Sequence, residues 1–140
     1  MSRPGPTFYV FHGEDEFTCA ETVADLRRRM ASSGMADLNV LFLDGRAVRL
    51  DELRHACEAI PFLSDRRMVV VTGLLERLGR DRGRFLEGLL EMLPRLPETT
   101  RLVLVEHRPL PDDHPVVARA REHERGYVRR SCSRARATTG

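Results

Sequence analysis

The side chains best suited to chemistry in this sequence are acidic, and three of them follow the first apolar run. Glu14, Asp15 and Glu16 come directly after Gly13, where a phosphate-binding loop would carry the pattern G-x-x-x-x-G-K-[ST]. Three carboxylates repel a phosphate, although they suit a magnesium ion or the positive end of a helix, for which Asp15 is the predicted cap. All 23 basic residues are arginine, which excludes sites that need a lysine, such as a Schiff base or a phosphorylated receiver domain.

The spacing of the other reactive side chains predicts neither a catalytic nor a metal site. The histidines are not at ligand spacing, no two cysteines form a C-x-x-C pair, and Ser64-Asp65 lacks the G-x-S-x-G context of a nucleophile. We therefore expect no catalytic residue, no metal ligand and no cofactor. The residues considered are His12, His55, His107, His114 and His123, and Cys19, Cys57 and Cys132.

The length and composition predict one globular domain. The chain has 140 residues, of which 41% are hydrophobic and 31% charged, as is ordinary for a soluble protein. No apolar run approaches the roughly 18 residues that span a bilayer, and the first residues do not read as a secretory signal. We expect a cytoplasmic location without membrane contact.

The charge is distributed unevenly along the chain. Residues 119–140 carry seven arginines and two acids, whereas residues 1–118 carry 16 arginines and 19 acids. The main part of the chain is therefore mildly acidic, which argues against a basic nucleic-acid-binding face on the domain itself.

Apolar runs alternate with amphipathic segments throughout the sequence. We predict strands at residues 8–11, 38–43, 68–71, 102–105 and 127–128, and helices whose apolar faces include Phe17, Leu53, Ile60 and Leu89. Residues 77–84 are predicted as an exposed loop, and Asp113 or His114 as the cap of a short helix that begins at Pro115. The alternation predicts an α/β fold in three layers, with a mostly parallel sheet of about five strands.

Residues 59–71 connect the second predicted helix to the third strand in an unusual way. Pro61 ends the helix because it lacks an N–H group, and Phe62 and Leu63 then place two large apolar side chains on the connection. Two interpretations are open. The pair either packs as ordinary core beneath the sheet edge, which the spacing alone favours, or stands in solvent as an anchor for a pocket on another protein.

The order of these segments resembles a known family. Residues 8–16, 38–45, 59–71 and 99–106 resemble, in sequence order, the N-terminal domain of the delta subunit of bacterial DNA polymerase III. The resemblance covers residues 7–129. That subunit belongs to the clamp loader, which opens the sliding clamp during DNA replication.

The resemblance implies a fold of the AAA+ or P-loop NTPase type without a functional P-loop. It also implies that Phe62 and Leu63 bind the clamp, and that the chain is not itself an enzyme, although the polymerase III holoenzyme is a DNA-directed nucleotidyltransferase. The implied partners are the sliding clamp (the beta subunit) and, through C-terminal domains, the gamma/tau and delta prime subunits. Contact with DNA would be indirect, through the complex.

The last segment departs from the family. We divide the chain into a delta-like domain, residues 1–129, and an arginine-rich tail, residues 130–140, which lacks large apolar side chains and is expected to be disordered. The family continues here with two helical domains, so the sequence resembles a truncated or frame-shifted product. The alternatives are a degenerate nucleotide-binding or receiver-like signalling domain, or an inactive fragment.

Overall fold

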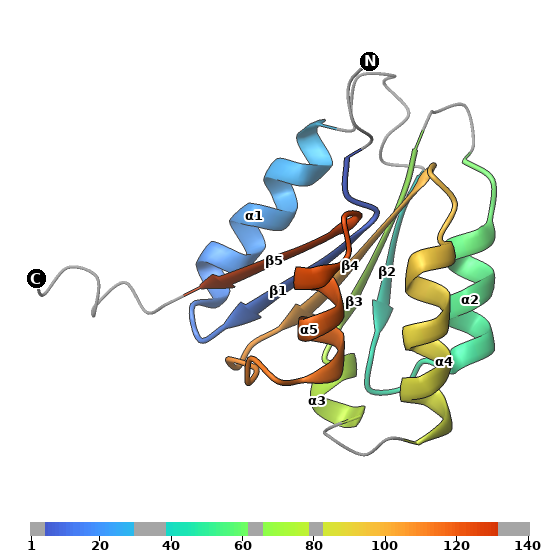
Figure 1. Ribbon diagram of the computed structural model, residues 1–140. Helices are drawn as coiled ribbons and strands as arrows, with labels where there is room; N and C mark the ends of the chain where they lie inside the picture. Colours follow the sequence, from blue (N-terminus) through green and yellow to red (C-terminus); the bar gives the residue numbers. More distant parts are fainter. Residues whose placement is uncertain (1–4, 30–38, 62–65, 79–82, 132–140) are drawn as a thin grey trace, which may run out of the picture.

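Parallel strands form the central sheet of the protein, in the order β2-β3-β4-β1-β5 (Figure 1). The computed structural model describes residues 5–29, 39–61, 66–78 and 83–131. Within these residues the strands are β1 (Phe8–Gly13), β2 (Val40–Asp44), β3 (Arg67–Thr72), β4 (Thr100–Glu106) and β5 (Gly126–Ser131). The predicted α/β fold with a sheet of about five strands is confirmed, and all the strand pairs are parallel.

The three central strands are the most apolar. Every residue of β1 and β4 is buried, and so are Met68 to Val71 of β3. Such continuous apolar runs are typical of parallel strands that are covered on both faces. The border strands β2 and β5 consist of partly buried and exposed positions, with Ser131 as their one buried residue, as expected where one side of a strand has no neighbour.

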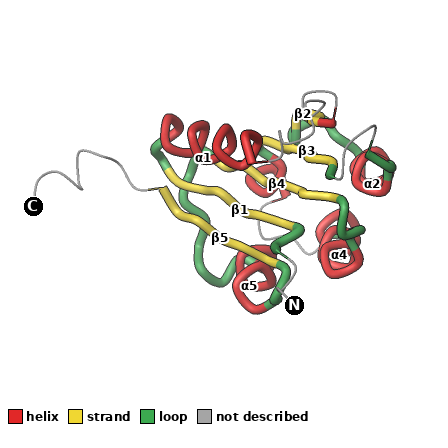
Figure 2. The backbone as a smooth tube through the Cα atoms, turned by 90° about the horizontal axis from the view of Figure 1, so that it is seen from above, coloured by secondary structure: helices red, strands yellow, loops and turns green. Residues whose placement is uncertain are grey.

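Helices cover both faces of the sheet (Figure 2). The helices α2 (Leu50–Glu58), α4 (Arg84–Met92) and α5 (Pro115–Glu122) pack on one face over a core that includes Phe8, Leu53 and Leu104. The helix α1 (Glu16–Arg29) packs on the opposite face over Tyr9, Phe11 and Val70. This arrangement is the predicted three-layer architecture.

Two of the predicted helix starts are observed. The carboxylate of Asp15 accepts hydrogen bonds from the N–H group of Thr18 at 3.0 Å and from its hydroxyl group at 2.7 Å, which satisfies the first turn of α1. His114, and not Asp113, caps α5, because its Nδ1 accepts from the N–H group of Val116 at 3.1 Å and Pro115 follows it.

The predicted loop at residues 77–84 is partly wrong. A short helix, α3 (Leu74–Leu78), follows β3 directly and includes Arg77, whose Nη1 atom donates to the carbonyl groups of Gly45 and Val48. Residues 79–82 lie outside the described residues. After α4, a 3-10 turn, η3 (Leu93–Arg95), leads to Leu96 and the next strand.

Two apolar residues do not lie where helical spacing placed them. Phe17 is 69% exposed and Ile60 is 88% exposed, because Phe17 lies at the start of α1 and α2 ends before Ile60. At the end of the chain, β5 continues past Arg129, so Arg130 and Ser131 belong to the sheet and not to the predicted tail. Residues 132–140 lie outside the described residues.

Candidate functional site

The end of α2 directs the chain away from the helix layer. Ala59 has an extended backbone, with φ −66° and ψ 143°, and Pro61 follows two residues later. A residue before proline also avoids helical geometry, so Ile60 cannot continue the helix. The sequence at residues 59–61 therefore ends α2 abruptly at the edge of the sheet where β3 begins.

Two side chains fasten this helix end to the sheet. The Nε atom of Arg67 donates a hydrogen bond to the carbonyl group of Ala56 at 2.9 Å, and the hydroxyl group of Thr100 donates to the carbonyl group of Cys57. The last carbonyl groups of a helix lack partners within the helix, so these bonds stabilise the end of α2. The connection from α2 to β3 therefore starts from a fixed point on the sheet.

Ile60 projects from that fixed point into solvent. Its 88% exposure is the highest among the large apolar residues that the structure describes as exposed. The predicted clamp-binding residues, Phe62 and Leu63, lie outside the described residues, as do Ser64 and Asp65. Their role remains a prediction, and Ile60 is an exposed apolar neighbour that helical spacing had assigned to the core.

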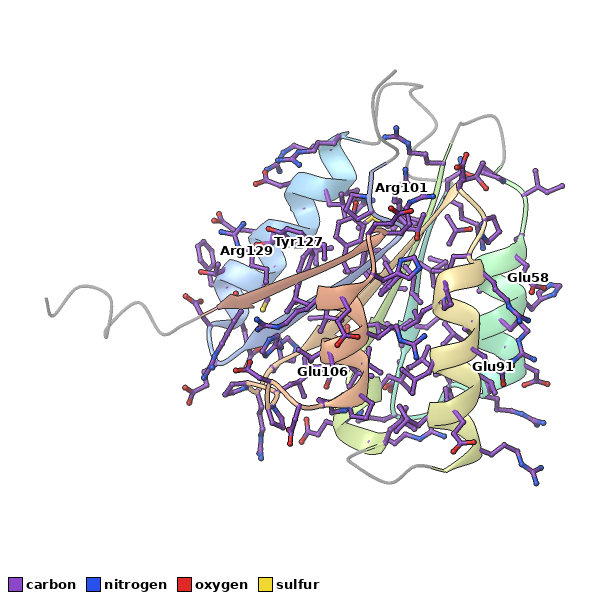
Figure 3. The ribbon with its side chains drawn as sticks, viewed as in Figure 1. Glu58, Glu91, Arg101, Glu106, Tyr127 and Arg129 are labelled. Carbon is purple, nitrogen blue, oxygen red and sulfur yellow. The ribbon has the colours of Figure 1, made fainter. Side chains whose placement is uncertain are left out.

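A small cavity of about 160 Å³ lies between α2, α4 and the η3 turn. Figure 3 shows Glu58 and Glu91, which line it from α2 and α4. Cys57 also lines it, but burial raises the pKa of this thiol to about 12, which keeps it protonated and unreactive at neutral pH. The cavity has no arrangement of groups for nucleophilic or acid–base catalysis.

The opposite edge of the sheet, at the carboxyl ends of β1, β3 and β4, is where nucleotides bind in many α/β folds. Gly13 ends β1 with φ +139°, and a Cβ atom at this position would lie 1.9 Å from the carbonyl oxygen of Ser131. The N-terminus of α1, a common phosphate site, is capped by the carboxylate of Asp15. The acidic trio therefore includes a helix cap where a phosphate would bind.

A second carboxylate at this edge was not identified from the sequence. Glu106, the last residue of β4, is buried and accepts hydrogen bonds from the N–H groups of Leu75 at 2.8 Å and Glu76 at 3.1 Å. Burial raises the pKa of Glu106 to about 7, although the two N–H groups oppose the shift. Glu106 thus secures the start of α3, and its position directly after an apolar strand was the available sequence signal.

His12 plays a similar part at the end of β1. Its side chain is buried, and its Nδ1 atom accepts from the N–H group of Leu110 at 2.8 Å. Burial lowers its pKa, and the charges of Arg130 and Arg121 lower it further. An Nδ1 atom that accepts a hydrogen bond carries no proton, and through this bond the ring stabilises the loop between β4 and α5.

The part of the chain that the structure describes contains neither a cluster of metal ligands nor a membrane-spanning helix. No group of three or more histidine, cysteine, aspartate or glutamate side chains in this part of the chain is arranged to hold a metal ion. Among its helices, none is both long and apolar enough to cross a bilayer.

Comparisons with known proteins agree with this architecture. Residues 9–117 match the family described as DNA polymerase III, delta subunit. The fold is similar to that of the Bacillus subtilis DNA clamp loader delta protein (YqeN), with a TM-score of 0.75 and 19% sequence identity, over 91% of this chain and 39% of that chain. The chain thus spans well under half the length of that protein, and the likeness at this identity concerns the fold. No curated protein matches the sequence.

Proposed function

This chain belongs to the DNA polymerase III delta subunit family, and we propose that it binds the sliding clamp and favours clamp opening without hydrolysing ATP. Phe62 and Leu63 are the proposed anchor, and Ile60 extends it. The contact is mechanical, because a surface that fits the open clamp better than the closed clamp shifts the clamp toward its open state.

The exposure of Ile60 carries this proposal. An isolated exposed apolar residue needs no special explanation, but Ile60 is followed within three positions by two further large apolar residues, Phe62 and Leu63. The hydrogen bonds from Arg67 and Thr100 hold the end of α2, shortly before Ile60 in the sequence. A fixed point of attachment reduces the entropy lost on binding.

The expected binding energy is adequate for such a contact. Burying two large apolar side chains contributes about 3–6 kcal/mol. A micromolar complex corresponds to about −8 kcal/mol. The anchor would therefore provide a large share of the affinity, as a few apolar residues do in most protein interfaces.

The nucleotide site of an AAA+ domain is proposed to be non-functional in this chain. Two observations support this: the sequence contains no lysine, and Asp15 caps the helix where a phosphate would bind. We further propose that the chain acts in the cytoplasm with the gamma/tau and delta prime subunits, and that the assembly of these subunits depends on domains beyond the fold described above.

The decisive experiment measures clamp affinity and stability on the same variant. Phe62→Ala combined with Leu63→Ala should weaken binding to the sliding clamp by at least about 30-fold in titration calorimetry, which corresponds to about 2 kcal/mol. The free energy of unfolding in urea should stay within about 0.5 kcal/mol of the wild-type value, because side chains that stand in solvent contribute little to folding. Phe17→Ala is the matched control, since Phe17 is also exposed but lies on α1.

Three results would contradict the proposal. A double variant that loses several kcal/mol of stability would place the pair in the core, as is usual for large-to-small core substitutions of about 2–5 kcal/mol. A stable double variant that binds the clamp as tightly as the Phe17→Ala control would show that Phe62 and Leu63 are not the anchor. A wild-type chain that does not bind the clamp would refute the proposal for this chain.

A further inference from the structure

A groove of about 270 Å³ runs between α1 and β5, on the face of the sheet opposite α2. Two arginines and an aspartate line it together with three aromatic rings; we call it the β5 groove, and these residues are Asp25, Arg29, Arg129, Tyr9, Phe11 and Tyr127. Figure 3 shows Tyr127 and Arg129 on β5 beside α1.

Tyr127 presents an aromatic ring at the groove that is held from behind. The ring is 42% exposed. It lies 5.9 Å from the ring of Tyr9, and 6.3 Å from the ring of Phe11 at an interplanar angle of 85°. Both supporting rings are buried, and such edge-on aromatic contacts are favourable. The groove therefore contains a positioned stacking surface.

The charges around the groove are mostly positive. Arg29 stands in the last turn of α1 after Arg28, and Arg129 extends from β5 on the other side. The Asp25 carboxylate, the acid of the groove lining, pairs with Arg28. Burial raises the pKa of the Tyr9 hydroxyl, and the charges that oppose the shift are those of Arg101, Arg66 and Arg29. The groove therefore favours an anionic occupant.

We propose that the β5 groove binds single-stranded nucleic acid, with a base stacked on Tyr127 and neighbouring phosphates paired with Arg29 and Arg129. A nucleotide offers a flat aromatic surface and a negative charge in every unit, whereas a peptide does so only with a particular sequence. Aromatic rings beside a basic groove are the usual means of binding single strands without sequence preference. The match to a DNA polymerase III family gives the groove a ready source of this ligand.

Direct binding of nucleic acid by this domain would depart from the sequence-based expectation that DNA is contacted only through the complex. The mildly acidic composition of residues 1–118 did not indicate this groove. The arginines of the groove come from distant segments of the chain that the fold brings together. The two binding surfaces are separate, since α1 with β5 and α2 lie on opposite faces and toward opposite borders of the sheet (Figures 1 and 2). Nucleic acid in the β5 groove therefore leaves the end of α2 open.

The test measures fluorescence anisotropy of a labelled oligodeoxythymidine of about 20 nucleotides, longer than the roughly 4–16 nucleotides that single-strand sites cover. The full chain should bind it saturably at about 50 mM salt. Arg29→Ala combined with Arg129→Ala should weaken binding at least about tenfold and reduce the salt slope by about 1.4, because two phosphate contacts are lost. Arg84→Ala with Arg95→Ala removes the same charge from exposed positions on α4 and η3, on the opposite face of the sheet, and should weaken binding less than about threefold.

A second pair of variants separates stacking from charge. Tyr127→Leu keeps apolar bulk but removes the ring, and it should weaken binding about tenfold. Tyr127→Phe keeps the ring and should bind within about twofold of the wild type. A thermal unfolding scan of each variant verifies that the fold is intact.

Three outcomes would overturn the proposal. The first is no saturable binding of the oligonucleotide by the wild-type chain. The second is an equal loss in both double-arginine variants, which would assign binding to charge alone. The third is binding of an acidic glutamate–tyrosine copolymer, but not of the oligonucleotide, through Tyr127, which would make the groove a protein docking site. Sliding-clamp affinity, measured on the same variants, should stay unchanged, so a failure here is distinguishable from a failure of the clamp proposal.

Discussion

At the carboxyl ends of β1 and β4, the buried side chains of His12 and Glu106 bond to backbone groups of the same chain, whereas at the amino end of β3 the connection from α2 leaves Ile60 in solvent. The polar side chains of the first region are directed into the fold, although the Nε2 atom of His12 is buried without a hydrogen-bond partner among the described residues. The second presents an apolar side chain on a fastened helix end. The two regions lie at opposite edges of the same parallel sheet.

The difference between the two regions shows which edge of the parallel sheet is available for binding a partner. Ligands of open parallel sheets usually bind beyond the carboxyl ends of the strands, and here the chain supplies its own carboxylates, from Asp15 and Glu106, to the helix starts at that edge. A helix N-terminus that is already capped by a carboxylate gains little from a phosphate. We therefore expect the carboxyl edge to serve stability and the amino edge to serve binding.

The largest expected effect on stability comes from adding one methyl group at Gly13, at the carboxyl edge of the sheet. Gly13→Ala places a Cβ atom 1.9 Å from the carbonyl oxygen of Ser131 at a φ of +139°, so β1 and β5 must separate or the backbone must change. We expect a loss of about 3–5 kcal/mol of stability in urea unfolding.

Gly83→Ala is the control for that experiment. A Cβ atom at Gly83 meets nothing within 4 Å, so its effect should stay within about 0.5 kcal/mol. If Gly13→Ala were as stable as this control, the carboxyl edge would not be as tightly closed as the contact between β1 and β5 indicates.

The next effect is a pH dependence that originates at Glu106. Burial raises the pKa of this carboxyl group from 4.5 to about 7, so the native state holds the proton more tightly than the unfolded state does. Below about pH 4.5 Glu106 does not reduce the free energy of unfolding. As the pH rises from about 4.5 through about 7, the free energy of unfolding falls by about 3 kcal/mol. Glu106→Gln should flatten this dependence in urea unfolding at about pH 5 and about pH 8.

Glu91→Gln is the matched substitution at an exposed carboxylate. It should leave the pH dependence of the wild type intact. An unchanged pH dependence in Glu106→Gln would mean that Glu106 is not the group that titrates, and the electrostatic account of the carboxyl edge would be wrong.

A smaller effect is expected at the amino edge. Ile60→Ala should weaken clamp binding about tenfold, because roughly 1.4 kcal/mol of apolar burial is lost from the interface. The urea midpoint should hardly move, since Ile60 is 88% exposed. Calorimetric titration and urea unfolding of the same preparation give both quantities, and a destabilised variant with normal clamp affinity would reverse the assignment of the two edges.

No binding is expected for ATP, which is the smallest of these effects. ATP with magnesium should give no heat beyond dilution in calorimetry, because the start of α1 is capped by Asp15 and no lysine is available. Binding tighter than about 100 μM, or about −5.5 kcal/mol, would show that the carboxyl edge has kept a ligand site.

Much of the sheet could be predicted because its strands are short apolar runs separated by clear breaks. Met68 to Val71 is buried as its β-branched composition predicts, and the cap at Asp15 follows from the local chemistry of a helix start. These features depend on neighbouring residues, so the sequence carries them directly.

The features missed depend on distant contacts. The helix α3 is only five residues long, and its start is secured by Glu106 from β4, which no local pattern shows. Helical spacing identified Ile60 and Phe17 as apolar-face residues but could not show whether another element covers them. The proposed anchor has the same difficulty, since Phe62 and Leu63 satisfy the sequence pattern of both a core and an interface.

The strand order has a consequence for synthesis on the ribosome. The first strand made, β1, lies between β4 and β5, so Phe8 pairs with Leu102 and Gly126 and has neither neighbour until the rest of the domain has emerged. Contacts between such distant residues slow folding. During translation the apolar segment of β1 therefore remains unpaired, and in this state it is exposed to chaperone binding and to aggregation. β5 follows the other described strands in the sequence, and its pairing encloses β1 within the sheet.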